Sequence, residues 1–448
     1  MGLLPLNYRR PEYVDDEKMG WRGRNGSSFD EKSASSLKSG QSGTASGIPD
    51  ALAFDKIING GTCPPCTIRD FMNYLIYIEH SAENLQFFLW YRDYIKRFAE
   101  APMSETQLAP EWTQAMQDET IAKIQRDNID KTKREAPIAA EMFKGTDFEK
   151  AHEISVEGRG GDPFSTPPRS SAGDDASLSS QSHAATYQSH AQDTFISAGA
   201  KLPFTIQPFR TEINRVITTY IADDAPRQLN LSSREQKAVV QALSYTTHPS
   251  AFLTLARTIE TTLRKQAHPN FIRWTICNGN PARVTFARGL GVSTVLLATI
   301  GAIILTLSGA GRGWRALFAI LWVIGIATLI TAVKGMCVVL HGLHHRHVRP
   351  WELFLDEAGA NDSVEQLCQG QRSFDSFGSG NSYEDEPWIV RYDHRFYVRK
   401  VFDRQVWIQE PALRTIQDTI FLQSMLCALM GAAVLTAIFV AVPAGNYF

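Results

Sequence analysis

The sequence predicts an all-α protein in which a helical bundle with a long disordered insertion is followed by three transmembrane helices. Three observations predict this organisation. Apolar residues recur at helical spacing, behind Ser and Thr capping signals, in several segments before residue 275. A tract rich in Ser, Gly, Pro and Gln interrupts these segments. Three long uncharged apolar stretches occupy the C-terminal third of the chain.

The composition of the 448-residue chain narrows the classes of function. The formal net charge is -2, from 45 Lys and Arg against 47 Asp and Glu, so no overall electrostatic drive favours nucleic acid as a partner. The six cysteines are scattered and form no disulfide framework, which indicates that most of the chain faces a reducing compartment. Residues 1–50 are rich in Ser, Gly and charge, and they predict a disordered N-terminal arm.

Ordered structure is expected from residue 51, where a short helix precedes a Cys-Pro-Pro-Cys motif. Cys63 and Cys66 have the spacing of a zinc-binding or redox pair. Two cysteines supply only half of a tetrahedral zinc site, and no second pair or nearby His completes it. A rigid turn ahead of Thr67 is therefore the favoured interpretation. We expect no metal site and no cofactor.

Residues 67–98 predict two helices that meet at a polar corner. Thr67 and Asp70 have the spacing of a capping box for the first helix. Glu83 and Asn84 open the second helix, just ahead of a dense aromatic run. A polar loop held by a packed scaffold is a common way to build a binding site. The alternative is that both residues only occupy a first helical turn, where acids and Asn are favoured.

The chain then becomes polar. Residues 110–150 contain charged helical patches, and residues 153–200 are of low complexity. Such a composition buries too little apolar surface to offset the entropy of ordering the chain. We therefore expect a mostly disordered insertion at about 100–205, inside a domain that spans 51–275.

Helical periodicity returns beyond Leu202. Ser232 or Ser233 is expected to cap one helix. A further helix begins at Phe252 and is expected to stop before His268-Pro269, because a proline disfavours helical geometry in the residue before it.

Residues 80–90 read His-Ser-Ala-Glu-Asn-Leu-Gln-Phe-Phe-Leu-Trp, which resembles the signature of the regulator of G-protein signalling (RGS) domain. Two further blocks agree with that family in order. Residues 229–235 match its hydrophobic-Asn-hydrophobic turn and capped helix, and Phe252 and Phe271 match the ends of its last long helix. The resemblance covers roughly 51–275 and implies an RGS-like helical bundle.

The resemblance also implies a function. An RGS domain binds the GTP-bound Gα subunit and promotes GTP hydrolysis by holding the switch loops of Gα, with no catalytic residue of its own. Glu83, Asn84 and Asn230 would be the polar contacts to Gα. The family usually places an acid directly after Phe252, where this chain has Leu253. The alternative is therefore a non-catalytic RGS-fold landmark or scaffold.

Three stretches at 289–311, 316–340 and 419–442 can each supply the ~20 mainly apolar residues that a spanning helix needs. Lys and Arg cluster before the first stretch and after the second, which places the N-terminal domain and the 341–418 loop in the cytosol. This domain order resembles the fungal membrane-anchored RGS proteins related to the bud-site-selection factor. That resemblance implies the plasma membrane, cortical polarity and a second, large membrane protein as a partner.

A basic cluster follows the second stretch, formed by His341, His344, His345, Arg346, His347 and Arg349. The histidines could bind a metal, but a collar attracted to anionic lipid heads is the favoured interpretation. Lys334 could line a transport path, which would make the protein a small transporter or channel. Near a helix end a lysine more often extends to the membrane interface, and this is the interpretation we favour.

Overall fold

The structure, a computed structural model, describes residues 13–14, 47–142, 180–355, 387–443 and 445. The described residues are mostly helical, which confirms the helical class. Contacts divide the chain into two compact units: the central unit (Glu83–Ile259) and the terminal unit (Met1–Ala82 with Glu260–Phe448). Most of the predicted arm at 1–50 lies outside the described residues.

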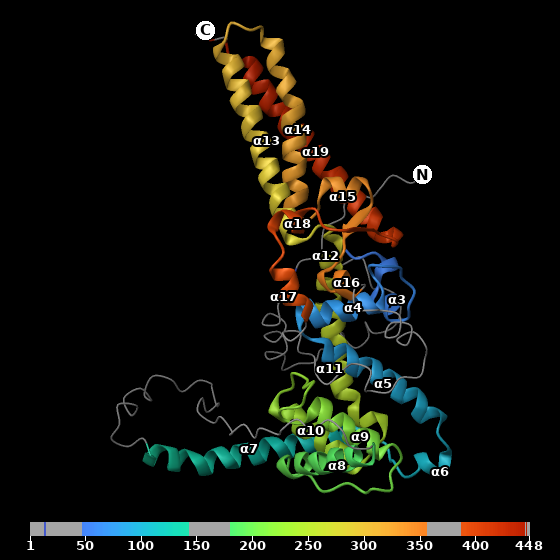
Figure 1. Cartoon of the computed structure of the whole chain (residues 1–448). Helices are drawn as coiled ribbons and strands as arrows, with labels where there is room; N and C mark the ends of the chain where they lie inside the picture. The colour runs from blue at the N-terminus through green and yellow to red at the C-terminus, as the bar shows by residue number, and fades with distance from the viewer. Residues whose placement is uncertain (1–12, 15–46, 143–179, 356–386, 444, 446–448) are drawn as a thin grey trace. The chain divides into compact units, whose positions relative to one another are not determined.

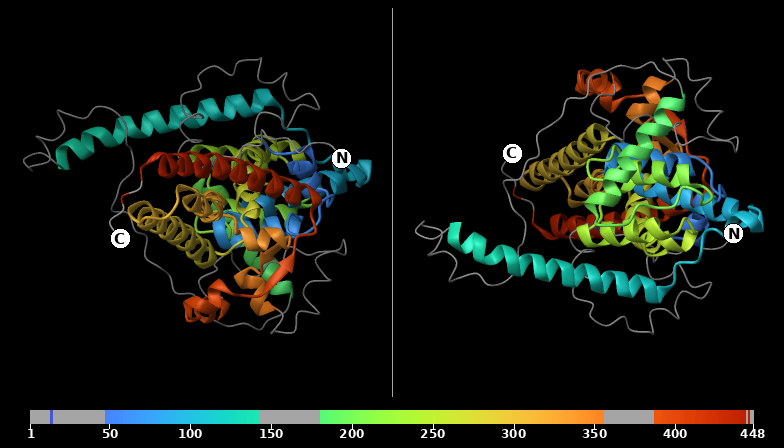
Figure 2. Two further views of the ribbon diagram at one scale, coloured as in Figure 1. Left: turned by 90° about the horizontal axis from the view of Figure 1, so that it is seen from above. Right: turned by 90° about the horizontal axis from the view of Figure 1, so that it is seen from below.

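The central unit is built from helices. In chain order they are α5 (Ala82–Glu100), α6 (Met103–Thr106), α7 (Gln114–Met142), α8 (Ser180–Ser197), α9 (Arg210–Val216), η4 (Ile217–Ile221), α10 (Ser233–Tyr245), η5 (Pro249–Phe252) and α11 (Leu253–Thr262). A capping box between Ser232 and Glu235 starts α10, so Ser232 is the cap. Figure 2 shows α7 as a single long helix.

Aromatic side chains of α5 form much of the core of the central unit. Phe252 is fully buried, and its ring centroid lies 5.9 Å from that of Phe87, 5.3 Å from that of Trp90 and 6.4 Å from that of Tyr94. All three pairs are edge-on, which suits the ring quadrupoles. The aliphatic Ile95 on the same helix is 42% exposed. The larger aromatic rings take the core positions instead.

The prediction of a mostly disordered insertion at about 100–205 is wrong in part, because some of these residues are helical. Helix α8 covers 180–197, and Ala191 and Phe195 on it are each only 1% exposed. The guanidinium carbon of Arg210 lies 5.2 Å from the centroid of the Phe195 ring. An i, i+4 apolar pair therefore orders a tract whose average composition is polar. Residues 143–179 of the insertion lie outside the described residues.

The terminal unit begins with η2 (Asp50–Leu52), α3 (Phe54–Ile58), α4 (Ile68–Tyr74) and η3 (Leu75–Glu79). The predicted capping box of Thr67 and Asp70 is confirmed at the start of α4. His80 ends the helical run with a left-handed backbone, φ 53°. The polar corner predicted after this helix therefore follows a true helix end at His80.

The end of the last predicted bundle helix differs from expectation. A turn of π-helix, η6 (Leu263–Ala267), leads directly into α12 (His268–Ile276), so the predicted stop before His268-Pro269 is wrong. Pro269 lies in the first turn of α12, where a missing backbone N–H is tolerated. The side-chain amide of Asn270 binds Val14, accepting its N–H at 2.9 Å and donating to its carbonyl at 3.0 Å.

Among the described residues, three helices are long and apolar enough to cross a membrane: α13 (Pro281–Leu307), α14 (Phe318–Val333) extended by η7 (Arg312–Leu317), and α19 (Pro411–Ala441). They lie side by side, with α14 packed against the other two (Figure 1). The second helix ends at Val333 rather than at the predicted residue 340. The chain turns there because Gly335 adopts φ 82°, a helix-ending conformation.

Small residues and one arginine organise the packing of these helices. Gly291 of α13 faces Gly325 of α14 so closely that an added Cβ at Gly291 would lie 3.1 Å from the Gly325 carbonyl oxygen. Trp322 is fully buried and stacks on Phe439 at 5.3 Å between ring centroids. The Nη1 of Arg315 donates to the carbonyls of Phe439 and of Val442, at 2.8 and 2.6 Å, and so satisfies the C-terminal end of α19.

The predicted 341–418 loop carries regular structure. It contains the end of α15 (Val338–Gly342), β1 (His345–His347), α16 (Pro350–Leu355), α17 (Pro387–Asp393), α18 (Tyr397–Val401) and β2 (Gln405–Trp407). β1 pairs antiparallel with β2, with His345 opposite Trp407. The all-α prediction missed this two-stranded sheet, because each strand is only three residues long and its partner is remote in sequence. Residues 356–386 lie outside the described residues.

We predict that Gly291→Val destabilises the α13–α14 contact, whereas Gly289→Val does not. A Cβ at Gly291 would lie 3.0 Å from the backbone nitrogen of Leu329, but one at Gly289 would meet nothing within 4 Å. Overpacking of this kind costs about 1–3 kcal/mol. Thermal unfolding of the full chain in detergent micelles measures the difference. Equal melting temperatures for the two variants would contradict the close approach.

We further predict that the terminal unit loses stability between pH 7 and pH 5. Burial lowers the pKa of His268 to about 4, and its Nε2 lies 2.8 Å from the Leu52 carbonyl oxygen, so Nε2 carries a proton and donates it. The unfolded state, with an ordinary pKa near ~6.5, binds the proton first as the pH falls. The loss for this residue at pH 5 is about 2 kcal/mol. In His268→Gln the unfolding free energy should depend less on pH, and an unchanged dependence counts against this assignment.

Candidate functional site

The predicted polar corner forms the N-terminal end of α5. Glu83 and Asn84 lie in the first turn of this helix, and both side chains are half-buried. The exposed N–H groups of a first turn favour a carboxylate there. Successive residues on a helix point about 100° apart, so Glu83 and Asn84 face different directions. The corner therefore offers a carboxylate and an amide on two sides of one helix end.

Tyr220 connects this helix end to a second segment of the central unit. Its ring centroid lies 5.9 Å from that of Phe87, one helical turn beyond Glu83. Burial raises the pKa of Tyr220, Arg227 opposes the rise, and the carboxylate of Glu83 adds to it. The charges of Glu83 and Arg227 therefore both act on the Tyr220 hydroxyl.

Asn230 is the next residue after Leu229, whose backbone contacts the same tyrosine. The N–H of Leu229 donates to the Tyr220 carbonyl oxygen at 2.9 Å, and the N–H of Leu231 donates to the Leu229 carbonyl at 2.8 Å. Between these two anchored residues the side chain of Asn230 is exposed, directly before Ser232 caps α10. The turn that holds Asn230 and the helix that opens with Glu83 thus both contact Tyr220, through the Leu229 N–H and the Phe87 ring. Among the described residues, no hydrogen bond joins Asn84 to Tyr220 or to the turn that holds Asn230.

Leu253, the position where an acid was expected in the sequence, directly follows the buried Phe252. It is the first residue of α11, and 38% of its surface is exposed. Position 253 therefore faces solvent and can hold a polar side chain without disturbing the core.

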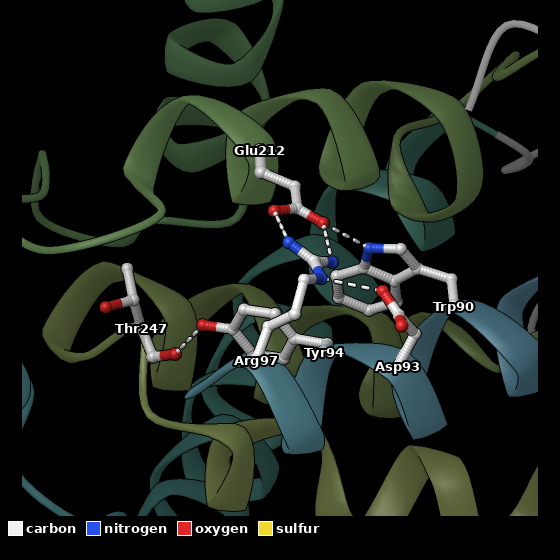
Figure 3. Close-up of polar contacts among 6 residues, drawn as sticks. All are labelled: Trp90, Asp93, Tyr94, Arg97, Glu212 and Thr247. Carbon is white, nitrogen blue, oxygen red and sulfur yellow. Dashed lines mark hydrogen bonds and ion pairs between the residues drawn. The ribbon is translucent and has the colours of Figure 1, made fainter. Parts of the chain in front are cut away.

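A polar clamp missed by the sequence analysis holds α5 against α9 (Figure 3). Glu212 accepts hydrogen bonds from Trp90 Nε1 at 2.7 Å and from both terminal nitrogens of Arg97 at 2.6 and 2.7 Å. The Nε of Arg97 donates to Asp93 at 2.6 Å, and the Tyr94 hydroxyl donates to the Thr247 carbonyl. Hydrogen bonds to Glu212 raise the pKa of Arg97, so this cation stays charged. No helical or strand spacing connects Glu212 to α5, so no sequence signal could have found the pair.

The cysteine motif acts as a structural turn within the terminal unit. Cys66 is buried, and burial raises the pKa of its thiol, so it does not form the thiolate that metals and redox partners require. The N–H of Cys63 donates to Glu410 Oε2 at 2.8 Å, and the Pro64 carbonyl accepts the N–H of Gln409 at 3.1 Å. These contacts fit the predicted rigid turn.

One group of side chains in the terminal unit could hold a metal ion: His341, His344 and Asp418, each with one ligand atom within 4.8 Å of the others. A tetrahedral zinc site with Zn–N near 2.1 Å needs its ligand atoms about 3.4 Å apart. The Nε2 of His341 lies 3.6 Å from Asp418 Oδ1, and burial lowers the pKa of His341. The geometry therefore suits a neutral His beside a carboxylate, and the side chains would have to close in to bind zinc.

The predicted lipid-facing collar of basic residues does not fit the structure. Arg346 is 6% exposed, His347 is 2% exposed, and Arg346 forms an ion pair with Glu352 at 2.9 Å. Arg349 lies with its guanidinium carbon 3.6 Å from the centroid of the Trp274 ring. These side chains are internal to the terminal unit because aromatic and acidic partners enclose them.

Comparisons with models of protein families, with curated proteins and with solved structures find no match. The functional argument therefore depends on the residues themselves. The central unit offers the carboxylate of Glu83, the amides of Asn84 and Asn230 and the exposed Leu253, from three places in the chain. This set of hydrogen-bonding groups suits recognition of a partner surface.

We predict that Glu212→Ala lowers the stability of the central unit by about 1–3 kcal/mol, because it leaves the buried Trp90 Nε1 and the Arg97 guanidinium unsatisfied. Asp93→Ala is the matched control. Its side chain is 63% exposed and pairs with Arg97 at i, i+4, so its loss should cost under about 0.5 kcal/mol. Urea unfolding of the full chain in micelles, followed by tryptophan fluorescence, measures both. Equal effects would show that the clamp is not the stabilising contact.

Proposed function

We propose that the chain is a membrane-anchored RGS-type regulator whose central helices bind Gα in its GTP-bound state and promote GTP hydrolysis. The observation that carries the proposal is that two separate RGS-like sequence blocks both contact Tyr220. The helix α5, which opens with Glu83, does so through the Phe87 ring, and the turn that holds Asn230 does so through the Leu229 N–H. Phe252, from the third block, belongs to the aromatic core that holds α5. The RGS-like bundle would then comprise 51–275 with its insertion.

The mechanism needs no nucleophile from this chain. The Gα subunit carries the glutamine that orients the attacking water and the groups that stabilise the transferring phosphoryl. Glu83, Asn84 and Asn230 would hydrogen-bond the switch loops in the shape of the transition state, which lowers the barrier by preorganisation. Asn230 is exposed on a short anchored turn, so it is the residue expected to lie nearest the water-orienting glutamine.

One observation favours a second function, a non-catalytic landmark or scaffold for cortical polarity. Leu253 places an exposed aliphatic side chain where an acid would accept hydrogen bonds from Gα. Such a surface can still bind a partner through burial of apolar area. Under this alternative the domain binds Gα, or another protein, without accelerating hydrolysis.

The three long apolar helices would anchor the domain at the plasma membrane, with the bundle and residues 341–418 in the cytosol. A second membrane protein is the expected partner there, by resemblance to the fungal group. A channel or transporter is the less favoured function. Lys334, its main support, ends α14, and its Nζ donates to Gln423 Oε1 at 3.3 Å.

Single-turnover GTP hydrolysis by Gα, with the full chain in lipid nanodiscs, tests the proposal. The wild-type chain should accelerate hydrolysis, and Asn230→Ala should reduce that acceleration by about tenfold or more, as for loss of one positioned donor. Asn128→Ala, at an exposed position on α7, is the control and should change nothing. Leu253→Glu should increase the acceleration.

Binding of GTP-loaded Gα by the same nanodiscs separates the two functions. Binding without acceleration, in the wild type and in Leu253→Glu alike, would favour the scaffold. Absence of binding in both would contradict the RGS proposal altogether.

A further inference from the structure

A short segment of the terminal unit, residues 396–407, displays large apolar side chains to its surroundings. We call it the juxtamembrane segment. Its exposed apolar residues are 39–85% exposed: Phe396, Tyr397, Val398, Phe402, Val406 and Trp407. Scattered exposed apolar residues are normal, but six within twelve residues form a continuous feature that calls for a partner.

The segment is attached to the first turns of α13. The Tyr397 hydroxyl donates to the Ala282 carbonyl at 3.0 Å. The rings of Phe402 and Phe286 meet edge to face, with centroids 6.0 Å apart. Because α13 continues from these residues into its uncharged stretch, the attachment determines how deep the segment lies along that helix.

Two further hydrogen bonds make this attachment rigid. Asn280, which caps α13, donates to the Lys400 carbonyl at 2.5 Å, and Arg283 donates to the Val401 carbonyl at 3.1 Å. Val401 itself is 2% exposed. The backbone of α18 is therefore held on its inner side, and its apolar outer side remains uncovered.

The position of the segment relative to the hydrocarbon layer follows from the rise of α13 per residue. The uncharged stretch of α13 begins at Gly289, and Phe286 lies three residues before it, about 4.5 Å along the axis. Ala282 lies about 10 Å before it by the same measure. A headgroup layer is about 5–7 Å thick on each side of the hydrocarbon. Phe402 therefore lies at headgroup level, and Tyr397 lies on the aqueous side of the headgroup layer.

The other end of the segment lies farther from the apolar core than Phe402, at a distance similar to that of Tyr397. The guanidinium carbon of Arg414, in the first turn of α19, lies 4.9 Å from the centroid of the Trp407 ring. Arg414 precedes the apolar core that begins at Ile420 by six residues, about 9 Å along the helix. Trp and Tyr are enriched at membrane–water interfaces because their rings are amphipathic.

The charge around the apolar row is basic. Residues 388–407 hold five Lys and Arg against two Asp, a formal net charge of +3. One of the two acids, Asp403, is buried and paired with Arg395 at 2.9 Å. Arg399 and Arg404 are exposed beside the apolar row. Each basic residue near an anionic membrane surface favours binding by about fivefold.

We propose that the juxtamembrane segment is an interfacial anchor that inserts into the headgroup layer and binds anionic phospholipids. Phe402 inserts among the headgroups, Trp407 and Tyr397 lie on their aqueous side, and Arg399 and Arg404 bind lipid phosphate and carboxylate groups. A soluble partner is disfavoured because this face lies at the depth of the headgroups. The inference depends on the three apolar helices and not on Gα, so the two proposals can fail separately.

Photocrosslinking tests the insertion. The full chain carries benzoylphenylalanine at position 396 or 402, in nanodiscs of phosphatidylcholine with phosphatidylserine. Position 245 is the control, because Tyr245 is 50% exposed in the central unit. We expect lipid adducts by mass spectrometry at 396 and 402 and none at 245. Adducts to protein at 396 and 402, from a partner or a second copy, would overturn the proposal.

Lipid preference tests the headgroup binding. Native mass spectrometry of the full chain should show more bound phosphatidylserine than phosphatidylcholine from an equal mixture. The double variant Arg399→Glu with Arg404→Glu should lose this preference by about fivefold or more for each charge. The Arg399→Lys with Arg404→Lys variant should retain it, and Lys96→Glu, exposed on α5, is the control. Equal retention of both lipids by the wild type would overturn the proposal.

Discussion

Phe252 is enclosed by rings from α5, and this aromatic packing is the contact on which the central unit depends. Phe87, Trp90 and Tyr94 approach it edge-on along two turns of α5, and Tyr220 adds a further ring against Phe87. Burying such rings contributes more than any single hydrogen bond in the unit. The same packing sets the direction of the first turn of α5. The carboxylate of Glu83 is therefore held in place by a core that contains none of the proposed contact residues.

Polar contacts then select one arrangement of this apolar core. Glu212 satisfies Trp90 and Arg97 together, so sliding α5 along α9 by one turn would leave two donors without acceptors. Arg315 has a comparable role in the terminal unit, where it satisfies the last carbonyls of α19. In both units a cation that helices share provides specificity, and apolar contacts provide most of the free energy of folding.

The outcome of the sequence predictions follows a physical rule. Features set by neighbouring residues were predicted well: the capping box at Thr67, a serine cap at 232 or 233, and the long apolar helices. Features set by remote partners were not. Ser180–Ser197 is helical because Phe195 finds Arg210, and β1 exists because β2 lies beside it. Average composition does not reveal such partners.

The sequence by itself determined the helical class, the long apolar helices and the identity of the residues at the polar corner, because periodicity, caps and hydropathy are local properties. Only the tertiary structure decided that α5 and the turn that holds Asn230 both contact Tyr220, that Arg346 and His347 are buried, and that residues 396–407 lie against the start of α13. Each of these depends on contacts between segments far apart in the chain. Such contacts arise from the packing of whole helices, which no spacing in the sequence encodes.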